Sequence, residues 1–81
     1  MKLFLISQDQ NDDYDTYDSA VVAAPDEETA RQADPYNGKP MEWGKTFSSW
    51  CRGPEHVTVR YIGEAAPDVK QGVVCASFNA G

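Results

Sequence analysis

The residues with the clearest capacity for binding chemistry lie in the middle of the chain, where aromatic and basic side chains alternate. Trp43 and Trp50 are interleaved with Lys45 and Arg52, in the only concentration of positive charge in the sequence. Aromatic faces and cations together can hold a nucleotide-like ligand by stacking and charge. Tryptophan and arginine are also the residue types that dominate protein-interface hot spots. A third interpretation is that these aromatic side chains complete a small core, and core and interface roles are not exclusive.

The acidic stretch that begins at Asp9 offers oxygen ligands of the kind that calcium prefers. Asp9, Asn11 and Asp13 have the spacing of the first three ligands of an EF-hand loop. The later positions do not match, because Tyr14 stands where a glycine is needed and Ala20 where a bidentate glutamate is needed. No helices are expected on either side of the stretch. We therefore predict no metal site.

Asp12, Asp13 and Asp15 in the same stretch are candidates for a protein-binding surface. Clustered carboxylates can imitate the phosphates of a nucleic acid and occupy a basic groove on a partner protein. Electrostatic complementarity of this kind makes association fast and sensitive to salt. Ordinary solubility explains the same charge equally well, so both interpretations stay open.

Catalysis would have to use His56, the only histidine, together with Cys51 or Cys75. General acid–base chemistry needs a partner nucleophile and a pocket, and proximity of Cys51 and His56 within a loop is weak evidence for such a pair. Two cysteines far apart in sequence make no disulfide framework, so we expect separate, reduced thiols. The sequence therefore predicts neither an enzyme nor a cofactor.

The net charge of −6 is unevenly distributed along the chain. Residues 1–34 carry nine acidic and two basic side chains, whereas residues 35–81 carry four acidic and five basic ones. An acidic chain is a poor candidate for phosphate-backbone binding, so we expect no direct contact with nucleic acid. No apolar run approaches the roughly 18–20 residues of a membrane span, and the N-terminus lacks a signal-peptide core. A cytoplasmic location is the default expectation.

A strand that runs straight into a helix organises the chain. Residues 19–24 form a short apolar run typical of a buried strand, and the proline that follows cannot donate to a sheet. Asp26 is the expected N-cap of the helix, with Ala30 and Ala33 facing the sheet and Arg31 facing water. This helix of about two and a half turns is too short to be stable alone. It must lie on a sheet.

Three more segments have strand patterns. Residues 2–8 are apolar on both faces, which suits an interior strand, and we expect them to pair with residues 19–24 as a wide hairpin. Residues 56–62 alternate, with Val57, Val59 and Tyr61 pointing inward. Residues 73–78 form the last strand.

Residues 35–56 form a long connection with several turn signals. A connection of this length is unusual in a compact domain. Either a short element lies near residues 46–51, or the loop folds its aromatic side chains back as a lid over an open sheet edge. We treat residues 1–81 as a single domain. The predicted fold is α+β, with an about four-stranded, largely antiparallel sheet and one short helix packed on one face.

Four segments carry a likeness to other proteins through the order of their strand and turn positions. They are "MKLFLISQD", "YDSAVVAAPDEETAR", "VTVRYIGEA" and "GVVCASFNAG". Together they resemble a group of small proteins encoded by phages and prophages. The resemblance spans most of the chain outside the middle loop and carries no catalytic motif. It implies an early or accessory phage protein that acts on host machinery, of which anti-defence proteins are one class.

Two functions follow as hypotheses. The first is a non-enzymatic phage accessory protein, monomeric or homodimeric, that binds a host protein such as a defence component and inhibits or redirects it. Its contact surface would be the acidic N-terminal half or residues 43–52. The alternative is a protein that binds or sequesters a nucleotide-like small molecule, which requires Lys39, Lys45 and Arg52 to converge on a concave site.

Overall fold

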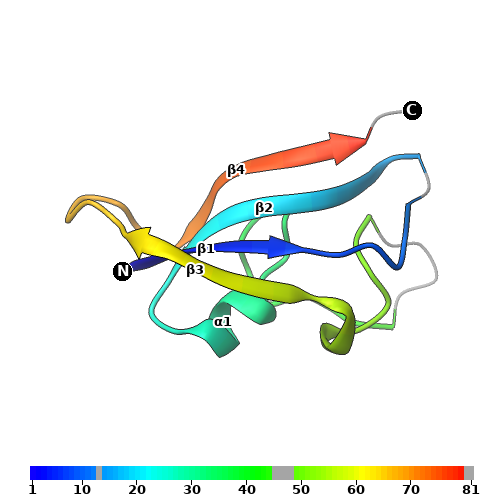
Figure 1. The fold of residues 1–81 in the computed structure, drawn as a ribbon, viewed down its shortest axis with the longest axis horizontal. Helices are drawn as coiled ribbons and strands as arrows, with labels where there is room; N and C mark the ends of the chain where they lie inside the picture. The colour runs from blue at the N-terminus through cyan, green and yellow to red at the C-terminus, as the bar shows by residue number, and fades with distance from the viewer. Residues whose placement is uncertain (13, 45–48, 80–81) are drawn as a thin grey trace.

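The computed structural model describes residues 1–12, 14–44 and 49–79. Its regular elements are β1 (Lys2–Ser7), β2 (Thr16–Ala24), α1 (Glu27–Arg31), a 3₁₀ turn (Pro54–His56), β3 (Thr58–Glu64) and β4 (Gly72–Asn79). The four strands form one antiparallel sheet in the order β3-β1-β2-β4, and α1 lies against one face of it (Figure 1). The predicted α+β architecture is therefore confirmed.

Strand β1 lies inside the sheet because both of its faces are apolar. Phe4 and Ile6 are buried on the face that carries α1, whereas Leu3 and Leu5 are half-buried on the opposite face. β1 pairs with β2 on one side and with β3 on the other. Both the interior position and the hairpin with β2 agree with the sequence prediction.

Helix α1 begins as its sequence predicts. Asp26 is the N-cap, and its carboxylate accepts a hydrogen bond of 2.7 Å from the backbone N–H of Thr29. Ala30 and Ala33 are buried. The prediction for Arg31 is wrong, because its guanidinium is half-buried and donates to the carbonyl of Val57. No helix in the described parts of the chain combines the length and apolar character needed to span a membrane.

The helix has only five residues and ends earlier than predicted because the chain turns back at once. The backbone N–H of Met41 donates to the carbonyl of Gln32 over 2.6 Å, and Ala33 and Pro40 form an isolated β-bridge. These contacts direct the middle loop across the same face of the sheet. α1 and the described residues of this loop make up the covering layer.

The middle loop completes the core through Trp50, whose side chain is fully buried at 0% exposure. The carbonyl of Ser49 accepts a hydrogen bond of 2.7 Å from the backbone N–H of Tyr17, which ties the loop to the start of β2. The loop thus folds back over one face of the sheet. The part of the lid prediction that falls on residues 45–48 lies outside the described residues.

Strand β3 starts later than predicted, because Pro54–His56 forms a 3₁₀ turn before it. Val57 is buried and Val59 packs against the core, as the alternation predicts. Tyr61 lies on the same side, with its ring edge-to-face on Phe4 at 5.8 Å between centroids. Its position on an edge strand leaves Tyr61 more than half exposed.

Candidate functional site

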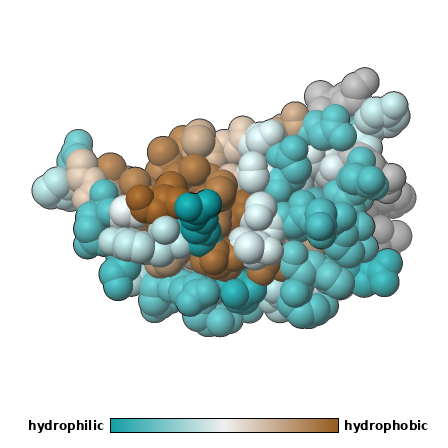
Figure 2. Space-filling view, viewed as in Figure 1, coloured by the Kyte–Doolittle hydropathy of each residue, from teal (hydrophilic) through white to brown (hydrophobic). Residues whose placement is uncertain are grey.

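The face of the sheet opposite the covering layer, here called the open face, has no described element packed on it. Its central rows can be read from the strand register, because opposed residues of an antiparallel pair point to the same side. One row contains half-buried Leu3 and fully buried Ala23, and the next contains Leu5, Val21 and Cys75. Figure 2 shows this apolar patch gathered over the strands and bordered by hydrophilic side chains.

Two β-bulges add apolar side chains to the strands that flank this patch. Ile62 is the extra residue where the β1–β3 register shifts, and it is 48% exposed. Val74 is the extra residue where the β2–β4 register shifts, and it is 54% exposed. Arg60 lies opposite Leu5 on β3, so a single cation borders the apolar row. Exposed apolar patches of this kind mark interaction surfaces.

The open face becomes polar toward the end of the sheet where the loop between β1 and β2 lies. The row after that of Leu5 contains only hydroxyl side chains, contributed by Thr58, Ser7, Ser19 and Ser77. Beyond this row lies the loop between β1 and β2, which carries the cluster of aspartates. An apolar patch, a hydroxyl row and an acidic end therefore follow one another along a single face.

Residues 9–12, 14 and 15 are the described part of the acidic loop (residues 9–15). Asp12 and Asp15 are exposed, and Asp13 lies outside the described residues. Asp15 has a left-handed φ of 61°, and its backbone N–H donates to the carbonyl of Asn79 over 2.6 Å. This contact joins Asp15 to the end of β4, so Asp15 stands at the end of the sheet.

Gln8 organises the acidic loop, although the sequence analysis did not single it out. It is buried, accepts from the backbone N–H of Asn11 at 2.8 Å, and donates to the carbonyls of Asn11 and Tyr17. A signal was present in the sequence. Gln8 continues the inward positions of Phe4 and Ile6, where a polar side chain must find hydrogen-bond partners.

The structure separates the aromatic and basic residues that the sequence groups together. Trp50 belongs to the core, so it cannot contact a partner while the domain is folded. Trp43 is half-buried, and its indole N–H donates to the side chain of Gln32 over 2.7 Å. Arg52 is exposed, and Lys45 lies outside the described residues. The core interpretation therefore applies to Trp50, and Trp43 packs against the same cluster.

Lys39 and Arg52 lie near opposite ends of the sheet. Lys39 follows Gly38, where a side-chain Cβ would lie 2.8 Å from the Cα of Gly72 at the start of β4. The backbone N–H of Arg52 donates to the side chain of Gln10 in the acidic loop. Since β4 pairs with β2 along its length, these positions are roughly 20 Å apart. These two cations do not converge on one ligand.

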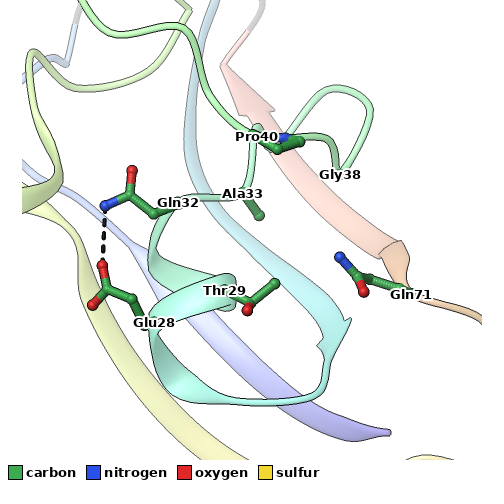
Figure 3. Close-up of a pocket in the computed structure, with 7 residues that line it drawn as sticks. All are labelled: Glu28, Thr29, Gln32, Ala33, Gly38, Pro40 and Gln71. Atoms are coloured by element: carbon green, nitrogen blue, oxygen red, sulfur yellow. Dashed lines mark hydrogen bonds between the residues drawn. The ribbon is translucent and has the colours of Figure 1, made fainter.

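A pocket of about 240 Å³ lies between α1, the following turn and the residue before β4 (Figure 3). It is lined by Glu28, Thr29, Gln32, Ala33, Gly38, Pro40 and Gln71. Gln32 is already engaged by Glu28 at 3.1 Å and by Trp43. The described lining residues include no cation to pair with a phosphate, so this part of the pocket does not have the chemistry of the predicted nucleotide-like site.

The thiol and imidazole groups do not form a reactive pair. Cys51 is buried, and its thiol donates to the carbonyl of Gly53 over 3.4 Å. Burial raises the pKa of this thiol, whereas a nucleophilic cysteine needs a lowered one. His56 lies at the surface, 3.6 Å from Glu55. Within the ranges that the structure describes, no three histidine, cysteine or acidic side chains are grouped to hold a metal ion.

Comparisons of the chain with protein-family models, curated proteins and solved structures found no match. The likeness to phage-encoded proteins stays a prediction from the sequence. Functional inference therefore depends on the geometry of this chain. The open face is its most distinctive surface, and sequence analysis missed it. The signal was β1, which is apolar on both faces in a chain with only one predicted helix.

Proposed function

We propose that this protein is a small acidic accessory protein of phage type that acts by binding a host protein through the open face. The observation that carries the proposal is the apolar patch around Leu5 and Val21, which no described helix or strand covers, together with exposed Ile62 on the flanking strand β3. A small domain gains no stability by leaving such side chains in water, since burying each one is worth about 1.5–3 kcal/mol. A protein partner would remove them from water.

The size of the open face supports a protein partner. The described chain measures 36 × 22 × 18 Å along its principal axes, and the open face is seen along the shortest one (Figure 2). The two longer dimensions enclose roughly 800 Å², so the open face is at most about as large as the area that each partner contributes to a standard protein interface. A small ligand would cover only a fraction of this surface.

The charges around the open face indicate which side chains the contact surface of the partner should carry. Its contact surface would be apolar at the centre, with a carboxylate placed to meet Arg60. Basic side chains would flank that centre on the side that meets Asp12 and Asp15. Such complementarity accelerates association and fixes the orientation of the complex more than it adds affinity. The acidic loop thus acts as a steering surface beside the apolar patch.

The resemblance to phage proteins supplies the biological setting of the proposal. The partner is a host protein in the cytoplasm of the infected cell, and a defence component is the target class that this setting favours. Binding alone would suffice for inhibition if the covered surface of the target is one that it needs. The proposal requires no cofactor.

The test is capture from host lysate by the tagged protein, compared with two matched variants. Ile62→Asp places a charge on the strand that flanks the open face, and Tyr36→Asp places the same charge at a 74% exposed aromatic residue in the turn after α1. Loss of an interface anchor typically costs about 2 kcal/mol or more. We expect one host protein to be retained by the wild type and Tyr36→Asp and lost by Ile62→Asp, with all three proteins folded at the temperature of the capture.

A second pair of changes tests the steering surface. Asp12→Asn and Asp15→Asn together remove two charges, and asparagine tolerates the left-handed backbone at position 15. The rate of association with the captured protein should fall and lose much of its salt dependence, while dissociation changes little. Retention of the partner by Ile62→Asp contradicts the proposal. Release of a bound small molecule in place of a protein would favour sequestration instead.

A further inference from the structure

We propose that the protein forms a homodimer in which β4 pairs antiparallel with β4 of a second copy across a two-fold axis. The pairing would join two four-stranded sheets into one of eight strands. It uses the edge of the sheet, including Val74, and leaves the central rows of the open face around Leu5 and Val21 available. It is therefore independent of host-protein binding.

Strand β4 has the features of an edge that invites pairing. It is eight residues long, six of them are exposed, and it contains no charged residue and no proline. Val74 and Phe78 are 54% and 46% exposed along it. A long, uncharged, apolar edge strand presents unpaired backbone groups and is a template for another strand. The bulge at Val74 lies near the start of β4, and residues 75–79 continue past it without a further extra residue in β4.

The other edge of the same sheet is protected. β3 carries Arg60 and Glu64, and a bulge at Ile62 interrupts its register. The hydroxyl of Tyr61 donates to the carboxylate of Glu64 over 2.7 Å, which holds a charged group along this edge. Charges and bulges are the means by which proteins prevent edge-to-edge association. β4 has no charge of this kind.

A second copy is the partner that the charge distribution favours. A chain of net charge −6 repels itself wherever its carboxylates meet. β4 itself is uncharged, so two copies can approach along it at the lowest electrostatic cost. An antiparallel pair of identical strands is also self-complementary about a two-fold axis, as closed dimers require. The pairing would cover Val74 and Phe78 with the same residues of the second copy or their neighbours.

The geometry predicts a dimer of modest strength. Eight residues span roughly 27 Å, and a contact one strand deep over that length is smaller than the roughly 800 Å² per partner of a standard interface. We therefore expect monomer and dimer in equilibrium at micromolar concentration. Raising the concentration should shift the population toward dimer by mass action.

A matched pair of variants tests which edge is used. Ser77 on β4 and Thr58 on β3 lie in the same hydroxyl row, at opposite edges of the sheet, and both are exposed. Ser77→Lys and Thr58→Lys therefore add the same charge in the same row of the sheet, one on each edge strand. Sedimentation analysis from about 5 to about 500 µM should show a dissociation constant raised at least about tenfold by Ser77→Lys and unchanged by Thr58→Lys.

Hydrogen exchange of backbone amides is a second measurement. It responds to pairing of strands but not to a contact between side chains alone. Amides of β4 should become more protected as the concentration of the wild-type protein rises, while amides of β3 keep the same protection. A protein that stays monomeric throughout the concentration range overturns the proposal. Equal weakening by both lysine variants overturns it too, because that result assigns the contact to the open face. Binding of β4 only to a strand of a different protein would replace the second copy by that partner.

Discussion

The two faces of the sheet differ in what covers them, although neighbouring residues of the same strands form both. In β2, Val22 is buried under the covering layer, whereas Val21 is half-buried on the open face. A helix of five residues cannot cover four strands, so the middle loop supplies Trp50 to complete that layer. No described helix or strand lies on the other face. The proposed partner would cover this second apolar face.

The covering layer is also held by polar contacts that the open face lacks. Arg31 donates to the carbonyls of Val57 and Pro54, which lie just before β3. This one side chain therefore joins α1 to the segment that enters the edge of the sheet. On the open face, Arg60 makes no comparable contact with the core. The comparison predicts that equivalent changes on the two faces will have unequal effects on stability.

The largest effect should come from Trp50→Ala. Removal of a fully buried tryptophan leaves a large cavity and typically costs about 3–5 kcal/mol, which is most of the stability of a small domain. Urea denaturation should show a much lower midpoint or an unfolded protein. Trp50→Phe keeps part of the ring volume and should fold with a smaller loss. If Trp50→Ala were as stable as the wild type, the covering layer would not be the core.

Val22→Ala and Val21→Ala compare the two faces at adjacent positions. Val22→Ala removes buried methyl groups and should destabilise by about 2 kcal/mol, whereas Val21→Ala should cost less than about 1 kcal/mol because its side chain is already partly in water. The free energy of unfolding from denaturant titration gives both values. Addition of a partner that covers the open face should enlarge the Val21→Ala effect. If Val22→Ala and Val21→Ala lowered the free energy of unfolding of the isolated protein equally, the proposed difference between the two faces would be wrong.

Arg31→Met and Arg60→Met make the same comparison with charged residues. Loss of the Arg31 hydrogen bonds leaves backbone carbonyls with fewer partners and should cost about 1–1.5 kcal/mol. Arg60→Met should change stability by no more than about 0.5 kcal/mol, as surface substitutions usually do. Thermal and chemical denaturation measure both. Arg60→Met should instead weaken capture of the host protein, an effect that Arg31→Met would show only through unfolding.

Asp26→Ala should produce the smallest effect and a characteristic pH dependence. Hydrogen bonds from Thr29, through its side chain and its backbone N–H, hold the pKa of the Asp26 carboxyl below its usual value. The ionised form therefore stabilises the folded state at pH values above the unfolded pKa of about 3.9. The stability difference between wild type and Asp26→Ala should be constant near neutral pH and disappear as the pH falls through the lowered pKa. A difference that persists in acid would assign the effect to something other than the carboxylate.

The fold could be predicted because its signals are local. Apolar runs, alternation and the cap at Asp26 depend on residues close together in the chain, and the observed strands follow them to within a few residues. The limits of β3 and α1 were less accurate, since Pro54–His56 and the turn after Arg31 depend on contacts with distant segments. The middle loop had local turn signals, but none of them fixed the path that the loop takes over the sheet.

The candidate site was harder to predict because exposure is not a property of composition. Trp43 and Trp50 look alike in the sequence, yet one is half-buried and the other is fully enclosed. Asp12 and Asp15 were identified by their charge, and the structure adds that Asp15 stands at the end of the sheet. Arg60 and Ile62 follow from the alternation as outward-facing residues, but they were not identified as site residues. Only the strand register shows that Arg60 lies beside Leu5 on the open face.

The sequence by itself determined the element types, the interior position of β1, the helix cap and the acidic character of the first hairpin. Each of these follows from periodicity, side-chain hydrogen bonding or charge within a short stretch. Only the tertiary structure decided which face the middle loop covers and which of the two edge strands stays free of charge. A chain with two apolar sheet faces and one covering layer has a choice of where to place that layer. Long-range packing of Trp50 and the hydrogen bonds of Arg31 determine which face the covering layer lies on.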